Sequence, residues 1–285
     1  MTSDTVGDRG APARRALGAV LATSLIGLFV LPIVALFLYA GYGNIATAAG
    51  SAGFRTALSF TLLASGIAVC FGILLGVPLG YILARYRFPG RSIVESIVLV
   101  PVMIPHLIVG IALLVLFAPT NPFGAWVAGL GIPIFDAIWG VVLVMVYVGA
   151  SYIVLTSELA FRSVDGEAIE AARSLGASPI EAFATVTLPQ AFRGIVTGSL
   201  LMWARGVSEI GGFLILAYAI YPSFPYGGPV TNTASVYIYN LYSTTGVQAA
   251  AGASALLVLV ALAVFVVVRL FDRTGMAWTK VGWFA

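Results

Sequence analysis

The sequence has few of the side chains on which most enzyme and metal sites depend. Its 285 residues include one cysteine (Cys70), one histidine (His106) and one lysine (Lys280). A lone cysteine forms no internal disulfide, and no cysteine-based metal cage is possible. Charged residues make up 9% of the chain, against about a quarter in soluble domains. This composition indicates a polytopic membrane protein.

A nucleotide-binding P-loop is also missing. That loop requires the pattern GxxxxGK[ST], but the only lysine lies in "GMAWTKVG" with no glycine directly before it. The chain therefore has no ATP site of this kind. Its net charge of +3 is too small to argue for nucleic acid, so we expect no nucleic-acid partner and no cofactor or metal held by this chain.

Long apolar runs dominate what is present. The chain is 60% hydrophobic with a mean hydropathy of +1.05, and a helix crosses a bilayer with about 20 mainly apolar residues. We predict an all-α membrane protein whose transmembrane domain, 16–271, lies between an N-terminal tail (1–15) and a C-terminal tail (272–285). The six predicted spans are 16–40, 57–83, 93–117, 138–161, 195–219 and 247–271.

The first of these runs is too long for a cleaved signal. Block 16–40 has 25 residues, whereas the apolar region of a signal peptide has roughly 7–15. We therefore expect a retained first span. The chain ends about fourteen residues after the last block (285 minus 271).

Basic residues set the expected orientation, because they are enriched in cytoplasmic loops. Six spans place both termini on one side, together with loop 163–193. Arg55 falls on the other side and Arg205 within a span. The cytoplasmic side then holds the other twelve of the fourteen basic residues: Arg9, Arg14, Arg15, Arg85, Arg87, Arg91, Arg162, Arg173, Arg193, Arg269, Arg273 and Lys280.

Loop 163–193 carries local signals for two short helices. Asp165 is placed to cap the first, and Gly176 suits the left-handed residue that ends it. The second opens with "SPIE", in which Ser178 and Glu181 form a predicted capping box around a proline at the first helical position. Pro189 is expected to stop or kink the chain after the second helix.

Apolar residues give each of these short helices one apolar face. This pattern favours a docking element for a cytoplasmic partner over a plain connector. They recur at steps of about three residues. The set is Ile169, Ala172, Leu175, Ile180, Phe183 and Val186.

The same loop resembles the EAA loop of ABC-importer permeases, through Glu170-Ala171-Ala172, Gly176 and Leu188-Pro189. The resemblance implies a type I importer fold in the cell membrane, with the loop as a coupling helix in a cleft of the ATPase. Glu170 would pair there with a basic residue. The implied ATPase-coupling residues are Glu170, Ala171, Ala172, Gly176, Ser178, Phe183, Leu188 and Pro189.

The family assembly contains two permeases, two ATPase subunits that bind ATP and Mg, and an external binding protein. Because the chain shows no internal repeat, the resemblance implies a homodimer of this chain. Some permeases of the family carry a C-terminal regulatory domain that binds the oxyanion. The short segment after the last block leads us to expect no such domain here.

The stretch "WARGVSEIGGFLILAYAIYP" (203–222) resembles the "ARxxSExGA" segment of permeases for tungstate, molybdate and sulfate. With the later "YIYNLYSTTG", it looks most like the tungstate/molybdate branch, although Ile210-Gly211-Gly212 stands where that branch usually has Phe-Gly-Ala. The expected cargo is thus an oxyanion supplied by an oxyanion-binding protein. Sulfate, phosphate, thiamine or iron importers of the same family stay open as alternatives.

Arg205 and Glu209 lie four residues apart, on one face of a helix. Ions inside a membrane usually face a bundle interior or a water path, so we hypothesise that the pair lines or gates the anion route. The alternative is a neutral ion pair that only holds helices together. The predicted pathway residues are Pro101, Pro105, Arg205, Ser208, Glu209 and Gly211.

Three further features near these blocks receive simpler interpretations. Pro101 and Pro105 invite a bend in the third block. His106 has no second histidine or cysteine with which to complete a metal site, and we interpret it as a satisfied interior residue. Glu158 and Arg162 form a predicted ion pair at a helix end.

Two other classes of protein fit less well. A secondary transporter commonly shows inverted repeats, which this sequence lacks, and it has no use for a coupling loop. An intramembrane enzyme needs a constellation of reactive groups, but Asp136, Glu158 and Glu209 fall in different layers of the membrane.

Overall fold

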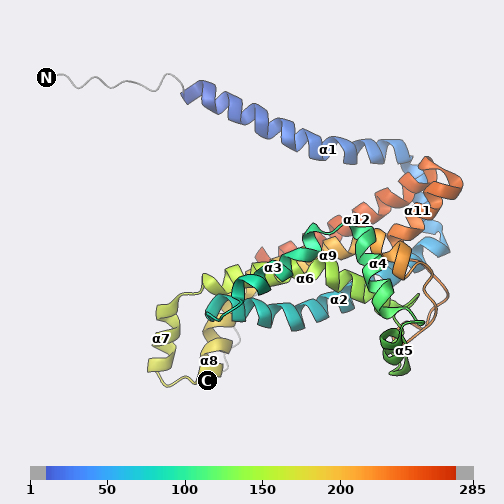
Figure 1. Ribbon diagram of the computed structural model, residues 1–285. Coiled ribbons are helices and arrows are strands. Elements are labelled where there is room, and N and C mark those ends of the chain that lie inside the picture. Colours follow the sequence, from blue (N-terminus) through green and yellow to red (C-terminus); the bar gives the residue numbers. More distant parts are fainter. Residues whose placement is uncertain (1–10, 274–285) are drawn as a thin grey trace, which may run out of the picture.

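The computed structural model describes residues 11–273, which are built from helices and short connections (Figure 1). Within this range the β-structure consists of isolated bridges in the segment 220–231. Expectations for positions 1–10 and 274–285 lie outside the described residues. The helices are α1 (Ala11–Gly50), α2 (Ala52–Arg85), α3 (Arg91–Met103), α4 (His106–Phe117), α5 (Pro122–Gly129), α6 (Ile138–Arg162), α7 (Gly166–Ser174), α8 (Pro179–Ala182), the π-helical turn η1 (Phe183–Thr187), α9 (Leu188–Val207), α10 (Gly211–Leu216), α11 (Ala234–Thr245) and α12 (Val247–Arg273).

Four helices in the described range, α1, α2, α6 and α12, are long and apolar enough to cross a membrane. The number becomes five if α3 and α4 together form one span. The predicted count of six spans is therefore not confirmed, because two of the six blocks are not single helices.

The third block, 93–117, is broken at the prolines. Helix α3 ends at Met103, α4 begins at His106, and the two axes differ by 111°. Ile104 has extended backbone angles (φ −79°, ψ 135°), as expected for a residue before proline. The predicted bend is confirmed, and block 93–117 consists of two helices that count as one span only when they are taken together as a bent pair.

The fifth block, 195–219, is also broken. Helix α9 ends at Val207, and residues 208–210 separate it from the short helix α10. The Glu209 carboxylate accepts a hydrogen bond from the amide of Gly212 at 2.8 Å, so a side chain satisfies a backbone group near the start of α10. The expectation of one helix over 195–219 is wrong, because this buried carboxylate supports a break.

The main core lies where α2, α6 and α9 pack together with parts of α4 and α10. Its largest buried side chains include Phe60, Ile138, Met145, Met202 and Phe213. Helix α1 packs on α12 through small residues such as Ala40 and Ala255, and its first part diverges from the bundle (Figure 1).

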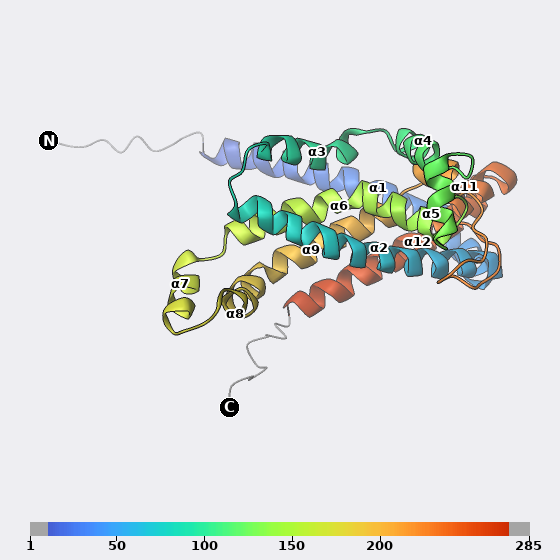
Figure 2. The ribbon, with the colours of Figure 1, turned by 60° about the horizontal axis from the view of Figure 1, so that its bottom comes forward.

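Different helices lie at the two ends of the bundle (Figure 2). The start of α1, the end of α12 and the short helices α7 and α8 lie toward one end, whereas α5, α10 and α11 lie toward the other. The end with α7 and α8 also holds Arg85, Arg91 and Arg162, at the termini of α2, α3 and α6. Loop 163–193 and these arginines therefore share one end of the bundle, and its cytoplasmic placement stays a prediction.

Candidate functional site

The loop between α6 and α9 forms the compact helical unit that its sequence predicts. The Asp165 carboxylate caps α7 by accepting from the amide of Glu167 at 3.0 Å. Gly176 ends the turn after α7 with φ +98°, a conformation that favours glycine. Both predicted signals are confirmed as local structure.

The capping box of α8 is also present. The amide of Glu181 donates to the Ser178 hydroxyl at 3.2 Å, and the amide of Ser178 donates to the Glu181 carboxylate at 2.7 Å. The hydrogen bond from Ser178 lowers the pKa of the Glu181 carboxyl below its ordinary value. The carboxylate is therefore ionised at neutral pH and holds the turn closed.

Pro189 does not stop the chain, but the chain changes direction between α8 and α9 (Figures 1 and 2). It lies in the first turn of α9, directly after η1. The amide of Leu188 donates to the carbonyl of Phe183, which is the wider spacing of a π-helical turn. π-helical turns and prolines, which lack the amide of the regular ladder, both accompany bends in helices.

The apolar residues of this loop divide between an inner and an outer face. The Phe183 ring packs edge-on against Tyr81 of α2, with ring centroids 5.2 Å apart, and Ile169 packs against the same cluster. By contrast, Leu175 and Ile180 are 90% and 80% exposed. We call residues 166–183, which comprise α7, α8, the turn between them and Phe183, the knob. It is fixed to the bundle by aromatic packing and presents two large apolar side chains outward.

The remaining predicted coupling residues lie on or beside this knob. Helix α7 carries Glu170, Ala171 and Ala172, of which Glu170 and Ala171 are exposed. Leu188 packs against the inner cluster, and Pro189 is exposed.

Four charged residues meet where α3 and α6 approach the knob. The predicted pair of Glu158 and Arg162 is present, with a carboxylate–guanidinium distance of 2.5 Å. Arg91 of α3 bonds the same carboxylate at 3.1 Å and Glu95 at 2.9 Å. Because Glu158 is buried, this network ties the start of α3 to the end of α6. The sequence spacing predicted the Glu158–Arg162 pair, but it did not predict that Arg91 and Glu95 of α3 would join it.

The Arg205–Glu209 pair lies at the break between α9 and α10. The Arg205 Nη1 is 2.9 Å from the Glu209 Oε2, so the predicted pair forms although Glu209 lies just beyond the helix. The Glu209 side chain is fully buried, and that of Arg205 is 18% exposed. A charge in this position requires its partner, because an unpaired ion is costly away from water.

His106 joins this pair, so both of its ring nitrogens have partners as expected for a satisfied residue, but the side chain is not in the interior of this chain. It is the first residue of α4, and its side chain is 49% exposed in this chain. Its Nδ1 lies 3.2 Å from the Glu209 Oε2, and its Nε2 is hydrogen-bonded to the Arg205 Nη2. We call His106, Arg205 and Glu209 the triad.

The other predicted pathway residues lie at various distances along the chain from the triad. Pro105 immediately precedes His106 and forms the N-cap of α4, whereas Pro101 lies inside α3. Ser208 is exposed, and its hydroxyl donates to the Arg205 carbonyl at 3.1 Å. Gly211 is buried where α10 crosses the start of α4.

Replacing Gly211 with alanine is expected to destabilise this crossing. A Cβ atom there would lie 2.8 Å from the His106 Cβ and 2.9 Å from the Leu107 amide nitrogen. Helix α4 would have to shift, at a cost of about 1–3 kcal/mol in the free energy of unfolding. The measurement is the midpoint of thermal unfolding in detergent. Gly66→Ala in α2 is the matched control, because no atom lies within 4 Å of its Cβ position. Equal midpoints for the two variants would contradict the close crossing.

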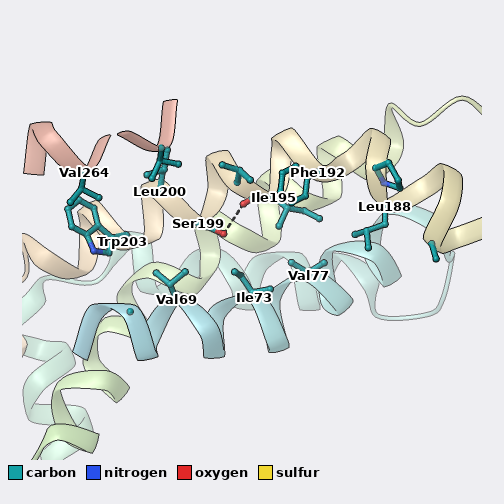
Figure 3. A pocket seen from close by; sticks show the side chains of 15 residues that line it. Val69, Ile73, Val77, Leu188, Phe192, Ile195, Ser199, Leu200, Trp203 and Val264 are labelled. Atoms are coloured by element: carbon teal, nitrogen blue, oxygen red, sulfur yellow. Dashed lines mark hydrogen bonds between the residues drawn. The ribbon is translucent and has the colours of Figure 1, made fainter. Parts of the chain in front are cut away.

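A cavity of about 580 Å³ between α2, α9 and α12 is separate from the triad (Figure 3). Its wall is apolar except for two groups, both with partners elsewhere in the chain. The Ser199 hydroxyl donates to the Ile195 carbonyl at 2.9 Å, and the Trp203 indole donates to the Ser65 hydroxyl at 3.0 Å. A wall of this kind suits hydrocarbon and offers no donors to a charged anion.

Comparison with known families identifies the architecture. The family described as "Binding-protein-dependent transport system inner membrane component" matches residues 76–274. The chain is 38% identical over 209 residues to the molybdate/tungstate transport system permease protein WtpB of Pyrococcus furiosus, covering 73% of this chain and 74% of that protein. It is 34% identical over 255 residues to WtpB of Thermococcus kodakarensis, covering 89% and 94%.

Solved structures support the fold. A bacterial alginate ABC transporter chain, from a complex with its periplasmic protein, superposes with a TM-score of 0.68 at 19% identity, covering 97% of this chain and 99% of that one. A chain of the MetNI methionine ABC transporter gives a TM-score of 0.59 at 20% identity, covering 78% and 95%. The fold is therefore that of type I ABC-importer permeases, as expected.

Proposed function

The chain belongs to the family of binding-protein-dependent transport system inner membrane components, and on that premise we propose that it is the permease subunit of an ATP-driven importer for molybdate and tungstate. The observation that carries this proposal is the likeness to WtpB over 89% of this chain. The sulfate transport permease CysW of Synechocystis is more distant, at 28% identity over 255 residues. Sulfate is therefore the less favoured cargo.

We propose that the knob couples the permease to a separate ATPase. Leu175 and Ile180 project from a unit that Phe183 fixes to α2 and α6. Two exposed apolar side chains on a rigid base suit insertion into a partner's cleft. Glu170 is exposed on α7 and available to a basic residue of that partner. Movement of the ATPase is then passed to the helices as rigid-body motion.

We propose that the triad lies on the route of the anion. Arg205 falls within a predicted membrane block, and its ion pair lies at a break between two helices. Its guanidinium donates in the planar geometry that oxyanions accept. The paired Glu209 limits the positive field, so an anion is attracted without being trapped. A homodimer would place two such triads about a shared path.

Reconstitution tests the proposed function. The chain is purified with its copurifying ATPase, inserted into lipid vesicles and supplied with its binding protein. Molybdate and tungstate are expected to stimulate ATP hydrolysis and to enter the vesicles only with ATP. Stimulation by sulfate alone would favour the alternative cargo, and stimulation by no oxyanion would overturn the anion assignment. Full uptake without a nucleotide-hydrolysing subunit would overturn the importer itself.

A further inference from the structure

His106 contributes to the triad in a way that its hydrogen bonds define. A guanidinium donates hydrogen bonds and accepts none, so the His106 Nε2 must be the acceptor in its contact with Arg205. The proton of a neutral ring then sits on Nδ1, which lies 3.2 Å from the Glu209 Oε2. A neutral ring with its proton on Nδ1 satisfies both contacts at once.

The three side chains are graded in exposure. Glu209 is fully buried, Arg205 is 18% exposed, and His106 is 49% exposed. The imidazole is therefore the member of the triad that solvent reaches most readily. The imidazole is hydrogen-bonded to the Nη2 of Arg205, while the buried Glu209 carboxylate accepts from Nη1. An oxyanion that approached Arg205 from the side of the ring would meet the His106 Nε2 at the Nη2 group.

We propose that His106 is a displaceable acceptor that holds Arg205 between transport events and gives way to an oxygen of the anion. The proposal rests on the function proposed above. A neutral imidazole is a weaker acceptor for a guanidinium than a doubly charged oxyanion, so the exchange favours the anion on arrival. When the anion leaves, the ring returns and again accepts a hydrogen bond from Arg205. His106 thus acts as a positioning residue for Arg205, and it also ties α4 to the break before α10.

Two substitutions separate the two contacts of the ring. In His106→Asn the shorter amide reaches the position of Nδ1, where it can donate to Glu209, but it leaves Arg205 without its acceptor. In His106→Gln the longer amide reaches the position of Nε2, where its oxygen can accept from Arg205. Both variants keep a polar side chain of similar size at the start of α4.

The decisive measurement pairs binding with transport. Equilibrium binding of labelled molybdate is measured on the purified permease–ATPase complex without binding protein, and uptake is measured in vesicles with saturating binding protein. His106→Asn is expected to bind molybdate about tenfold more tightly and to transport it about tenfold more slowly, the size of one lost hydrogen bond to a charged group. His106→Gln is expected to stay within about twofold of the unsubstituted protein in both.

The outcomes are distinct from those for the proposed function. Unsubstituted protein that binds and transports no oxyanion would overturn both proposals. Oxyanion transport by the unsubstituted protein, with Asn and Gln variants that match it, would overturn only the role of His106. Equal losses of uptake in both variants without tighter binding would show that the residue serves packing alone.

Discussion

Changing Glu209 to alanine is expected to lower the free energy of unfolding by about 3–5 kcal/mol, because it leaves a largely buried arginine without its counter-ion. Three contacts disappear together: those to Arg205, to His106 and to the amide of Gly212. The last of these supports the break between α9 and α10, so the change affects both charge balance and backbone. We expect a much lower midpoint of thermal unfolding in detergent and loss of oxyanion uptake.

Companion variants show whether the charge pair causes this loss. Removing both charges in Arg205→Ala with Glu209→Ala is expected to be less destabilising than Glu209→Ala alone, since no unpaired ion remains. Glu167→Ala is the control, because that carboxylate is exposed on α7. A Glu209→Ala protein that unfolds like this control would refute the burial argument. Unimpaired transport in the separate Arg205→Ala and Glu209→Ala proteins, with normal assembly, would remove the pair from the anion route.

Local signals in the sequence predicted the knob well because its structure depends on neighbours in the chain. The Ser178–Glu181 capping box and the positive φ of Gly176 are encoded within a few residues, and both are present. The effect of Pro189 on the chain was harder to predict, because it depends on the backbone hydrogen bonds of the neighbouring turn η1. A proline at a helix start and one at a helix break share the same local pattern.

Breaks inside apolar blocks could not be placed by hydropathy alone. By composition, α9 and α10 belong to one continuous apolar block. The buried Glu209 side chain, however, accepts a hydrogen bond from the amide of Gly212 and supports the break between the two helices. The role of His106 depends on a 111° turn that brings α4 onto α10, which no spacing rule supplies. One signal was available, since a lone polar residue inside an apolar block is a functional candidate by default.

Changing Leu175 or Ile180 to aspartate is expected to abolish coupling while leaving the chain folded. Both side chains are almost fully exposed, so neither supports the permease's own core. If a partner's cleft buries them, each contributes about 1.5–3 kcal/mol to the contact, and a tenfold change in affinity corresponds to about 1.4 kcal/mol. An aspartate adds the cost of burying a charge. We therefore expect ATPase affinity to fall at least tenfold for each variant.

The measurement is the amount of ATPase that copurifies with each variant, together with ATP-driven uptake and the midpoint of thermal unfolding. Val230→Asp is the matched control, because it places the same charge at an exposed apolar position toward the opposite end of the bundle from the knob. That variant is expected to retain the ATPase. Since the knob's inner face is fixed by Phe183 rather than by Leu175 or Ile180, lost ATPase binding with an unchanged unfolding midpoint identifies the outer face as the contact. Full retention of the ATPase by both knob variants would place that contact elsewhere on the permease.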